Sequence, residues 1–221
     1  MKLKNSLIMI LAFVLFLNLF AGAAAAQDKK EITFGSVSWP GVTQKSIIVK
    51  QILNDLGYEV TIKPLKVSVV LSGLARGDLE VFLGGWLQTQ KKQLKPYLEE
   101  GTIKVWKVHI EKALYQTAVP DYVYEAGVTS MADLKKNAEK FDKTYYGIEP
   151  GNFGNEIIRK AIKNDTYSLG DWNIMESSTT GMLSAMEKAY KQKEWIVAHG
   201  WEPHWMNIAY DLKYLKDPEG I

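Results

Sequence analysis

Residues 32–60 read ITFGSVSWPGVTQKSIIVKQILNDLGYEV, and this stretch decides the fold. It opens with a strand pattern over residues 32–37 and continues with apolar residues at helical spacing over residues 44–56. Gly57 follows the last of these residues, where a helix commonly ends in a left-handed conformation. Residues 58–63 then alternate like a second strand. A strand, a helix and a strand in this order predict a parallel pair with the helix on one face.

The same alternation continues along the rest of the chain. The next predicted elements are a helix at 68–76, a strand at 79–83, a strand at 104–118, a loop at 121–128, helices at 131–141, 156–164 and 180–191, and strands at 145–148, 172–177 and 195–198. Because the alternation falls into two blocks, we expect two α/β lobes joined by short, strand-like crossovers.

The first 26 residues differ in character from the rest. Lys2 and Lys4 precede an apolar stretch from Ser6 to Phe20, and small residues follow up to Ala26. The stretch is short for a membrane span of about 20 residues, so we expect a secretory signal cleaved near Ala26. Removing its two lysines from the 27 basic residues leaves 25, equal to the 25 acidic residues. A mature chain without basic excess suggests no nucleic-acid partner.

The sequence contains no cysteine, which excludes disulfides, zinc–thiolate sites, a cysteine nucleophile and a lipid-modified cysteine after the signal. An exported chain without a lipid anchor is retained only by a second membrane, so we expect a periplasmic location. The three histidines, His109, His199 and His204, show no metal-ligand spacing. Since nucleophile-elbow and phosphate-loop patterns are also missing, we expect neither an enzyme nor a cofactor.

Trp39, Trp86 and Trp201 share one sequence context. Each follows a predicted strand and lies in a loop punctuated by Gly or Pro. Ligands of α/β sheets gather beyond the carboxyl ends of the strands. Aromatic faces attract a methylated ammonium ion by about 0.5–2 kcal/mol each. Core packing is the commoner explanation for any single tryptophan, but three in matching loops favour a box around a soft cation. The tryptophans within or beside predicted strands are interpreted as core residues: Trp106, Trp172 and Trp195.

Gly41 and Val42 lie at the start of the first predicted helix. Free backbone N–H groups and the helix dipole favour an anion at such a position. A zwitterion would place its carboxylate on these amides and its methyl groups on the aromatic faces. Helix starts of this kind are common, so the argument depends on the tryptophans beside it.

Four stretches carry a resemblance to a known family: GSVSW at 35–39, VFLGGW at 81–86, YGIEPGN at 146–152 and GWEPH at 200–204. In this order they resemble the substrate-binding proteins of glycine betaine and choline ABC importers, most closely the choline-binding branch. The resemblance implies a type II-like periplasmic binding protein with two lobes that close on a small quaternary ammonium ligand. It further implies a membrane permease as partner, and we expect a monomer. The implied ligand contacts are Trp39, Trp86, Tyr115, Trp201 and Asn152.

Two residues bear on the choice of ligand. Choline-type members carry an Asp two residues after the first box tryptophan, and Gly41 occupies that position here. Without this carboxylate the site loses a group that would repel a ligand carboxylate, which favours a betaine. His204 resembles a histidine that contacts the carboxylate in some betaine binders. A hydrogen-bonded loop histidine is the alternative interpretation.

Relatives continue beyond the equivalent of residues 217–220. We therefore expect residues 27–112 to form lobe 1, completed by 212–221 but lacking its C-terminal part, and residues 113–211 to form lobe 2. Missing elements would leave apolar surface exposed on lobe 1. The alternatives to a transport protein are a ligand-sensing or partner-binding protein of the same fold and a non-functional fragment.

Overall fold

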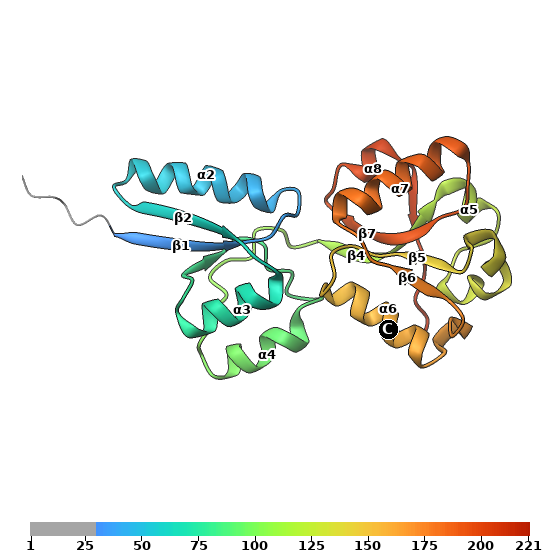
Figure 1. The fold of residues 1–221 in the computed structure, drawn as a ribbon, viewed down its shortest axis with the longest axis horizontal. Coiled ribbons are helices and arrows are strands. Elements are labelled where there is room, and N and C mark those ends of the chain that lie inside the picture. The colour runs from blue at the N-terminus through green and yellow to red at the C-terminus, as the bar shows by residue number, and fades with distance from the viewer. Residues whose placement is uncertain (1–29) are drawn as a thin grey trace, which may run out of the picture.

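A computed structural model of the chain describes residues 30–221, so the predicted signal sequence at 1–26 lies outside the described residues. Two β-sheets organise this part of the chain: a 3-stranded sheet in the order β2-β1-β3 and a 5-stranded sheet in the order β6-β5-β7-β4-β8. Figure 1 shows each sheet with its own helices, forming two lobes side by side. The predicted two-lobe α/β fold is confirmed.

The first lobe is built from the expected alternation of strands and helices. Its elements are β1 (Glu31–Ser36), α2 (Val42–Asp55), β2 (Glu59–Pro64), α3 (Val67–Arg76), β3 (Val81–Phe82) and α4 (Lys91–Glu99). Strand β1 pairs in parallel with both β2 and β3. Helix α2 covers one face of this sheet and α3 the other (Figure 1). Gly57 follows α2 with φ of 89°, a conformation that suits glycine.

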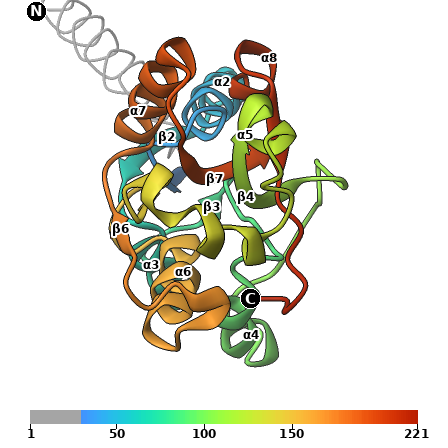
Figure 2. The same ribbon diagram turned by 90° about the vertical axis from the view of Figure 1, so that its right-hand side faces the viewer.

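The second lobe mixes parallel and antiparallel pairing. Its elements are β4 (Leu114–Pro120), α5 (Asp121–Glu125), η1 (Met131–Asp133), η2 (Lys135–Phe141), β5 (Thr144–Tyr146), α6 (Phe153–Lys163), η3 (Thr166–Ser168), β6 (Asn173–Met175), α7 (Thr179–Gln192), β7 (Val197–Glu202), α8 (Met206–Ala209) and β8 (Leu212–Tyr214). Strand β5 is parallel to β6 and β7, whereas β4 is antiparallel to β7 and β8. Helices α7 and α6 lie on opposite sides of this sheet (Figure 2).

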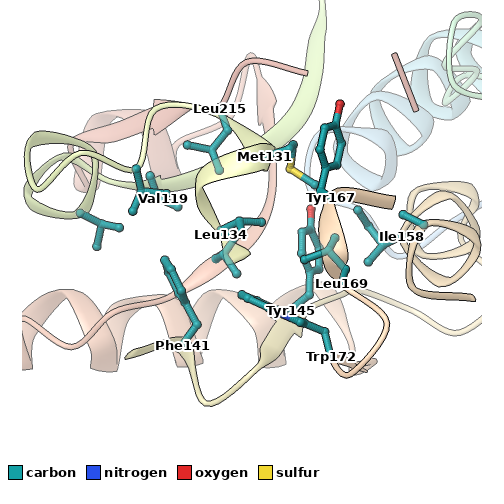
Figure 3. Packing of buried hydrophobic residues seen from close by; sticks show 14 residues of the cluster. Val119, Met131, Leu134, Phe141, Tyr145, Ile158, Tyr167, Leu169, Trp172 and Leu215 are labelled. Atoms are coloured by element: carbon teal, nitrogen blue, oxygen red, sulfur yellow. The ribbon is translucent and has the colours of Figure 1, made fainter. Parts of the chain in front are cut away.

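A large apolar cluster fills the second lobe on the side of α6, with Tyr145, Leu134 and Trp172 among its members (Figure 3). The Phe141 ring lies 5.8 Å from the ring of Trp172 and 5.2 Å from that of Trp195, measured between centroids. Trp172 and Trp195 are therefore packing residues, as predicted.

Trp106 is a different case, because its side chain is 99% exposed. The prediction that Trp106 packs in a core is wrong. Residues 104–113 form no strand, and regular pairing begins only at β4. The prediction of a loop at 121–128 is also wrong in its first half, where α5 forms. Asp121 lies in the first turn of α5, where a negative charge is favourable.

The last residues pack on the second lobe. Strand β8 pairs with β4, with Leu212 opposite Pro120, and Leu215 is fully buried in the cluster of Figure 3. We expected residues 212–221 to complete lobe 1, and the structure corrects this. The chain therefore passes between the two sheets once, in the segment between α4 and β4.

Helix α2 turns apolar side chains to solvent. Ile47, Ile48, Ile52 and Leu56 are between 54% and 69% exposed, while Val42 and Ser46 are its buried residues. A surface helix normally places such a row against a core. The first lobe thus carries the exposed apolar surface that the sequence led us to expect. No helix within residues 30–221 is both long and apolar enough to cross a membrane.

Candidate ligand-binding site

A cavity of about 730 Å³ lies between the two lobes. The four aromatic residues of the predicted box, Trp39, Trp86, Tyr115 and Trp201, all line it. Trp39 and Trp86 come from the first lobe, and the other two come from the second. The structure thus brings together side chains that lie up to 162 positions apart in the sequence, since the set runs from 39 to 201.

Tyr115 and Trp201 form the fixed wall of this cavity. They lie opposite each other on the antiparallel strands β4 and β7, and their rings are stacked at a centroid distance of 6.2 Å. Cross-strand aromatic pairs of this kind stabilise a sheet. Trp86 meets Tyr115 edge-on from the first lobe, at 6.0 Å and an interplanar angle of 68°. Three rings from both lobes therefore border one space.

Trp39 follows β1 and is half-buried. Its carbonyl oxygen accepts the N–H of Val42 at 3.2 Å, which closes a turn into α2. Its indole Nε1 donates to Oε2 of Glu149 at 3.3 Å. Since Glu149 belongs to the second lobe, this hydrogen bond joins the two lobes across the cleft.

Asn152 caps the N-terminus of α6. Its side-chain oxygen accepts the N–H of Gly154 at 2.8 Å and the hydroxyl of Tyr115 at 3.3 Å. Burial, with smaller contributions from Tyr145 and Glu149, raises the pKa of Tyr115 well above its ordinary value. The phenol therefore stays protonated and keeps donating to Asn152. Asn152, which the sequence predicts as a polar contact of the ligand, thus orients the ring of Tyr115.

The loop that carries Glu149 and Asn152 has a defined shape. The N–H of Asn152 donates to the carbonyl oxygen of Glu149 at 3.0 Å, which closes a turn. Pro150 and Gly151 occupy its central positions, and Gly151 has φ of 86°. This is the residue pattern of a type II turn, in which glycine supplies the positive φ at the third position.

A buried amide holds this loop from below. Asn155 is fully buried, and its Nδ2 donates to the carbonyl oxygens of Ile148 and Glu149, at 2.9 and 3.2 Å. Its Oδ1 accepts the N–H of Ile148 at 3.1 Å and lies 3.0 Å from Nε2 of His199. Because Asn155 Oδ1 can only accept, Nε2 of His199 carries the proton. The loop is thereby locked to strand β7.

His199 continues this buried network. Its Nδ1 lies 3.0 Å from the hydroxyl of Tyr145, which lies 3.0 Å from Oγ1 of Thr117. With the proton on Nε2, Nδ1 accepts from Tyr145. Burial lowers the pKa of His199 to about 3, so the ring is neutral at neutral pH. Its ring lies 5.3 Å from that of Tyr115, directly behind the wall of the cavity.

Gly41 and Val42 line the cavity, but their amides already have partners. The N–H of Gly41 donates to Oε1 of Gln44 at 2.7 Å, and that of Val42 donates to Trp39 as described. A ligand carboxylate at this helix start would have to displace the Gln44 side chain. The use of these two amides by an anion stays a prediction.

His204 lies behind Trp201 and is not among the residues that line the cavity. The two rings are 4.7 Å apart. Nδ1 of His204 accepts the N–H of Met206 at 3.2 Å, and burial lowers the pKa of the ring. The neutral ring therefore carries its proton on Nε2, which is buried without a partner within residues 30–221. A contact between His204 and ligand stays a prediction.

Two residues that the sequence did not assign to the site are Glu149, which bonds to Trp39, and Thr179, which lines the cavity. The Glu149 carboxylate accepts from Thr179 twice, from the backbone N–H at 2.8 Å and from Oγ1 at 3.1 Å. Thr179 is the first residue of α7, follows the N-cap Ser178, and lines the cavity. A run of Ser and Thr before a helical pattern predicts a helix start. It does not reveal that a distant carboxylate reaches that start. Residues 30–221 contain no cluster of three His, Asp or Glu side chains suited to a metal.

Comparison with known proteins shows the family of the chain. Residues 30–221 match the family described as the substrate binding domain of ABC-type glycine betaine transport system. The chain belongs to this family. An ABC-transporter choline-binding protein solved in complex with choline is 34% identical to this family member, with a TM-score of 0.81 over 85% of this chain and 65% of that one.

Two further relatives bind or are named for betaines. The lactococcal OpuAC, solved closed with glycine betaine, is 30% identical with a TM-score of 0.76 over 87% of this chain and 72% of its own. The glycine betaine/carnitine transport binding protein GbuC of Listeria monocytogenes is 39% identical over 90 residues, which is 40% of this chain and 30% of GbuC. This family member therefore spans 65% of the choline-binding protein and less than a third of GbuC.

Proposed function

We propose that this protein binds a small quaternary ammonium compound in the aromatic cavity and delivers it, from the periplasm and as a monomer, to the permease of an ABC importer. The observation that carries the proposal is the convergence of Trp39, Trp86, Tyr115 and Trp201 on one cavity between two lobes. A trimethylammonium group has no N–H to donate, so aromatic faces are the surfaces that best attract it.

The available energy is sufficient for useful affinity. Each aromatic face contributes about 0.5–2 kcal/mol to the binding of a desolvated cation. Four such faces contribute several kcal/mol, and a micromolar dissociation constant corresponds to about −8 kcal/mol. Burial of the methyl groups contributes about 25 cal/mol for each Å² removed from water, which brings the sum into this range.

Glycine betaine is the favoured ligand, with choline second. Gly41 lines the cavity at the position where a carboxylate would repel a betaine. The neutral His204 keeps an N–H without a partner in the structure next to Trp201, and this donor suits an anionic group. A contact between this donor and the ligand would require a local shift of the Trp201 ring that opens His204 Nε2 to the cavity.

Isothermal titration and thermal shift with glycine betaine, choline, carnitine and proline betaine test the proposal. A ligand that binds only the folded state raises the unfolding midpoint, and we expect the shift with glycine betaine to be at least as large as that with choline. Trp86→Ala should abolish the response. Trp195→Phe is the matched control, since Trp195 packs against Phe141 and does not line the cavity, and we expect it to leave the ligand-induced shift unchanged. A shift with choline alone would overturn the ranking, and no binding of any quaternary ammonium compound would overturn the function.

A further inference from the structure

The Glu149 carboxylate occupies an unusual position between the lobes. It belongs to the loop after β5 in the second lobe, yet one of its oxygens accepts the indole N–H of Trp39 in the first lobe at 3.3 Å. Its other contacts are with Thr179 at the start of α7, at 2.8 and 3.1 Å. One side chain thus connects a box residue of the first lobe, the binding loop and a helix of the second lobe.

The charge of Glu149 is not neutralised by a cation of the protein. None of the ion pairs among residues 30–221 includes it, and its three donors are neutral groups. The N-terminus of α7 favours a negative charge at this point but leaves it formally uncompensated. A carboxylate without a cationic partner, hydrogen-bonded to a ring that lines the cavity, is suited to a cationic ligand.

The backbone beneath Glu149 is held firmly enough to fix this carboxylate. Asn155 bonds its carbonyl oxygen, and the turn to Asn152 closes over it. The Trp39 ring packs against the apolar cluster of the first lobe, but its indole N–H finds its hydrogen-bond partner in the second lobe. The orientation of the ring within its own lobe therefore depends in part on Glu149.

We propose that Glu149 is a positioning residue that links closure of the lobes to ligand binding: its carboxylate holds the indole of Trp39 from across the cleft and sets a fixed negative charge beside the aromatic box. The ligand part of this inference rests on the proposed function. The cross-cleft bond requires the lobes to lie as close together as they do in this structure, so it orients Trp39 wherever that arrangement is populated, with or without the cation. Losing it lets the ring turn away and speeds release of the ligand.

Two substitutions separate this role from simple capping of α7. Glu149→Gln removes the charge and leaves one acceptor oxygen in place of two, so the side chain cannot accept from both the Thr179 N–H, which bonds Oε1, and the Trp39 indole, which bonds Oε2. Trp39→Phe keeps an aromatic face but removes the N–H donor, and it leaves the contacts with Thr179 intact. Glu156→Gln is the matched control, because Glu156 is an exposed carboxylate in the first turn of the neighbouring helix α6.

The experiment is a double-mutant cycle on glycine betaine and choline binding, with dissociation rates and thermal midpoints measured in parallel. We expect Glu149→Gln and Trp39→Phe each to raise the dissociation constant about tenfold through faster dissociation, and the double variant to be little worse than either, since coupled residues are not additive. Glu156→Gln should match the wild type. In ligand-free protein, Glu149→Gln should also move the Trp39 indole N–H resonance in a ¹⁵N–¹H spectrum.

Several outcomes would overturn the inference. The first is a wild-type dissociation constant in Glu149→Gln. The second is a dissociation constant of the double variant that is raised by the product of the two single effects. The third is a Trp39 indole resonance that does not move when residue 149 is changed. If Glu149→Gln does not fold because α7 loses its partner, the Trp39→Phe variant decides alone. Ligand dissociation from Trp39→Phe at the wild-type rate would then refute the inference. If the wild type binds no quaternary ammonium ion, the proposed function fails, and the indole resonance alone decides whether Glu149 holds Trp39.

Discussion

His199 makes the stability of the second lobe sensitive to acid. The ring is 2% exposed, Nε2 donates to Asn155, and Nδ1 accepts from Tyr145. Protonation of Nδ1 would set a positive charge and a second donor against the Tyr145 hydroxyl in a site that excludes water. This is why burial lowers the pKa of His199 from its ordinary value of about 6.5 to about 3 in the folded protein.

The consequence for stability follows from proton linkage. Above pH 6.5 His199 is neutral in both states and has no effect on the pH dependence. Between pH 6.5 and about 3 the unfolded chain binds a proton here and the folded protein does not, so the free energy of unfolding falls as the pH falls. The slope approaches ~1.4 kcal/mol per pH unit, which gives a loss of about 2 kcal/mol between pH 7 and pH 5.

Urea unfolding of the wild type and of His199→Gln at pH 7 and pH 5 measures this loss. Gln can donate and accept but does not titrate, so its free energy of unfolding should fall about 2 kcal/mol less between these pH values. The variant will be less stable than the wild type at pH 7, but the test compares the change in the free energy of unfolding between pH 7 and pH 5 within each protein. His109→Gln is the comparison: desolvation and Lys45 also lower the pKa of His109, but this ring is exposed, so the variant should change the pH dependence less than His199→Gln does. Equal pH dependence in the wild type and His199→Gln would refute the reasoning.

Two further predictions concern the site and the first lobe. Gly154→Ala should weaken glycine betaine binding about 5- to 100-fold in calorimetry. The added methyl group would lie 2.8 Å from ring carbons of Tyr115 and would displace that ring. Gly181→Ala is the control and should bind normally, because its new neighbour is a rotatable serine hydroxyl at 3.0 Å. Ile52→Gln should change the free energy of unfolding by less than about 0.5 kcal/mol, because Ile52 is 54% exposed, whereas Leu71→Ala in the buried cluster should cost about 2–5 kcal/mol. A large loss of the free energy of unfolding in Ile52→Gln would show that another surface covers the apolar residues of α2 in solution.

The elements with strong periodicity were predictable from the sequence. The predicted helices at 44–56 and 180–191 correspond to α2 and α7 with end residues that differ by one or two. Their apolar spacing, an end glycine at 57 and polar residues before 179 are local signals. The loop positions of Trp39 and Trp86 followed from the same signals, because the end of a strand is visible in the sequence. The prediction of a loop position for Trp201 is wrong, because β7 runs on to Glu202 and pairs Trp201 with Tyr115.

The misread segments are those in which tertiary context decides. Residues 104–113 have the apolar and β-branched content of a strand, but pairing requires a neighbour, and none lies beside them in the described residues. Strand β8 is only three residues long, and its pairing with β4 joins segments more than 90 positions apart. Glu149 lies in the stretch YGIEPGN, but no pattern in the sequence indicates its contact with Trp39, 110 positions away.

The two lobes contribute unequally to the site, and this bears on how ligand acts. In the second lobe, Tyr115 and Trp201 are stacked on paired strands, and buried hydrogen bonds through Asn155 fix the loop beside them. In the first lobe, Trp39 packs against the apolar cluster, but its indole bonds to a carboxylate of the other lobe, and α2 beside it buries little apolar surface. Segments with few buried apolar contacts open at lower free energy than a well-packed core. The second lobe is therefore the preorganised half of the cavity, and we expect a bound cation to stabilise chiefly the first lobe, by giving Trp39 and Trp86 a partner that both lobes share.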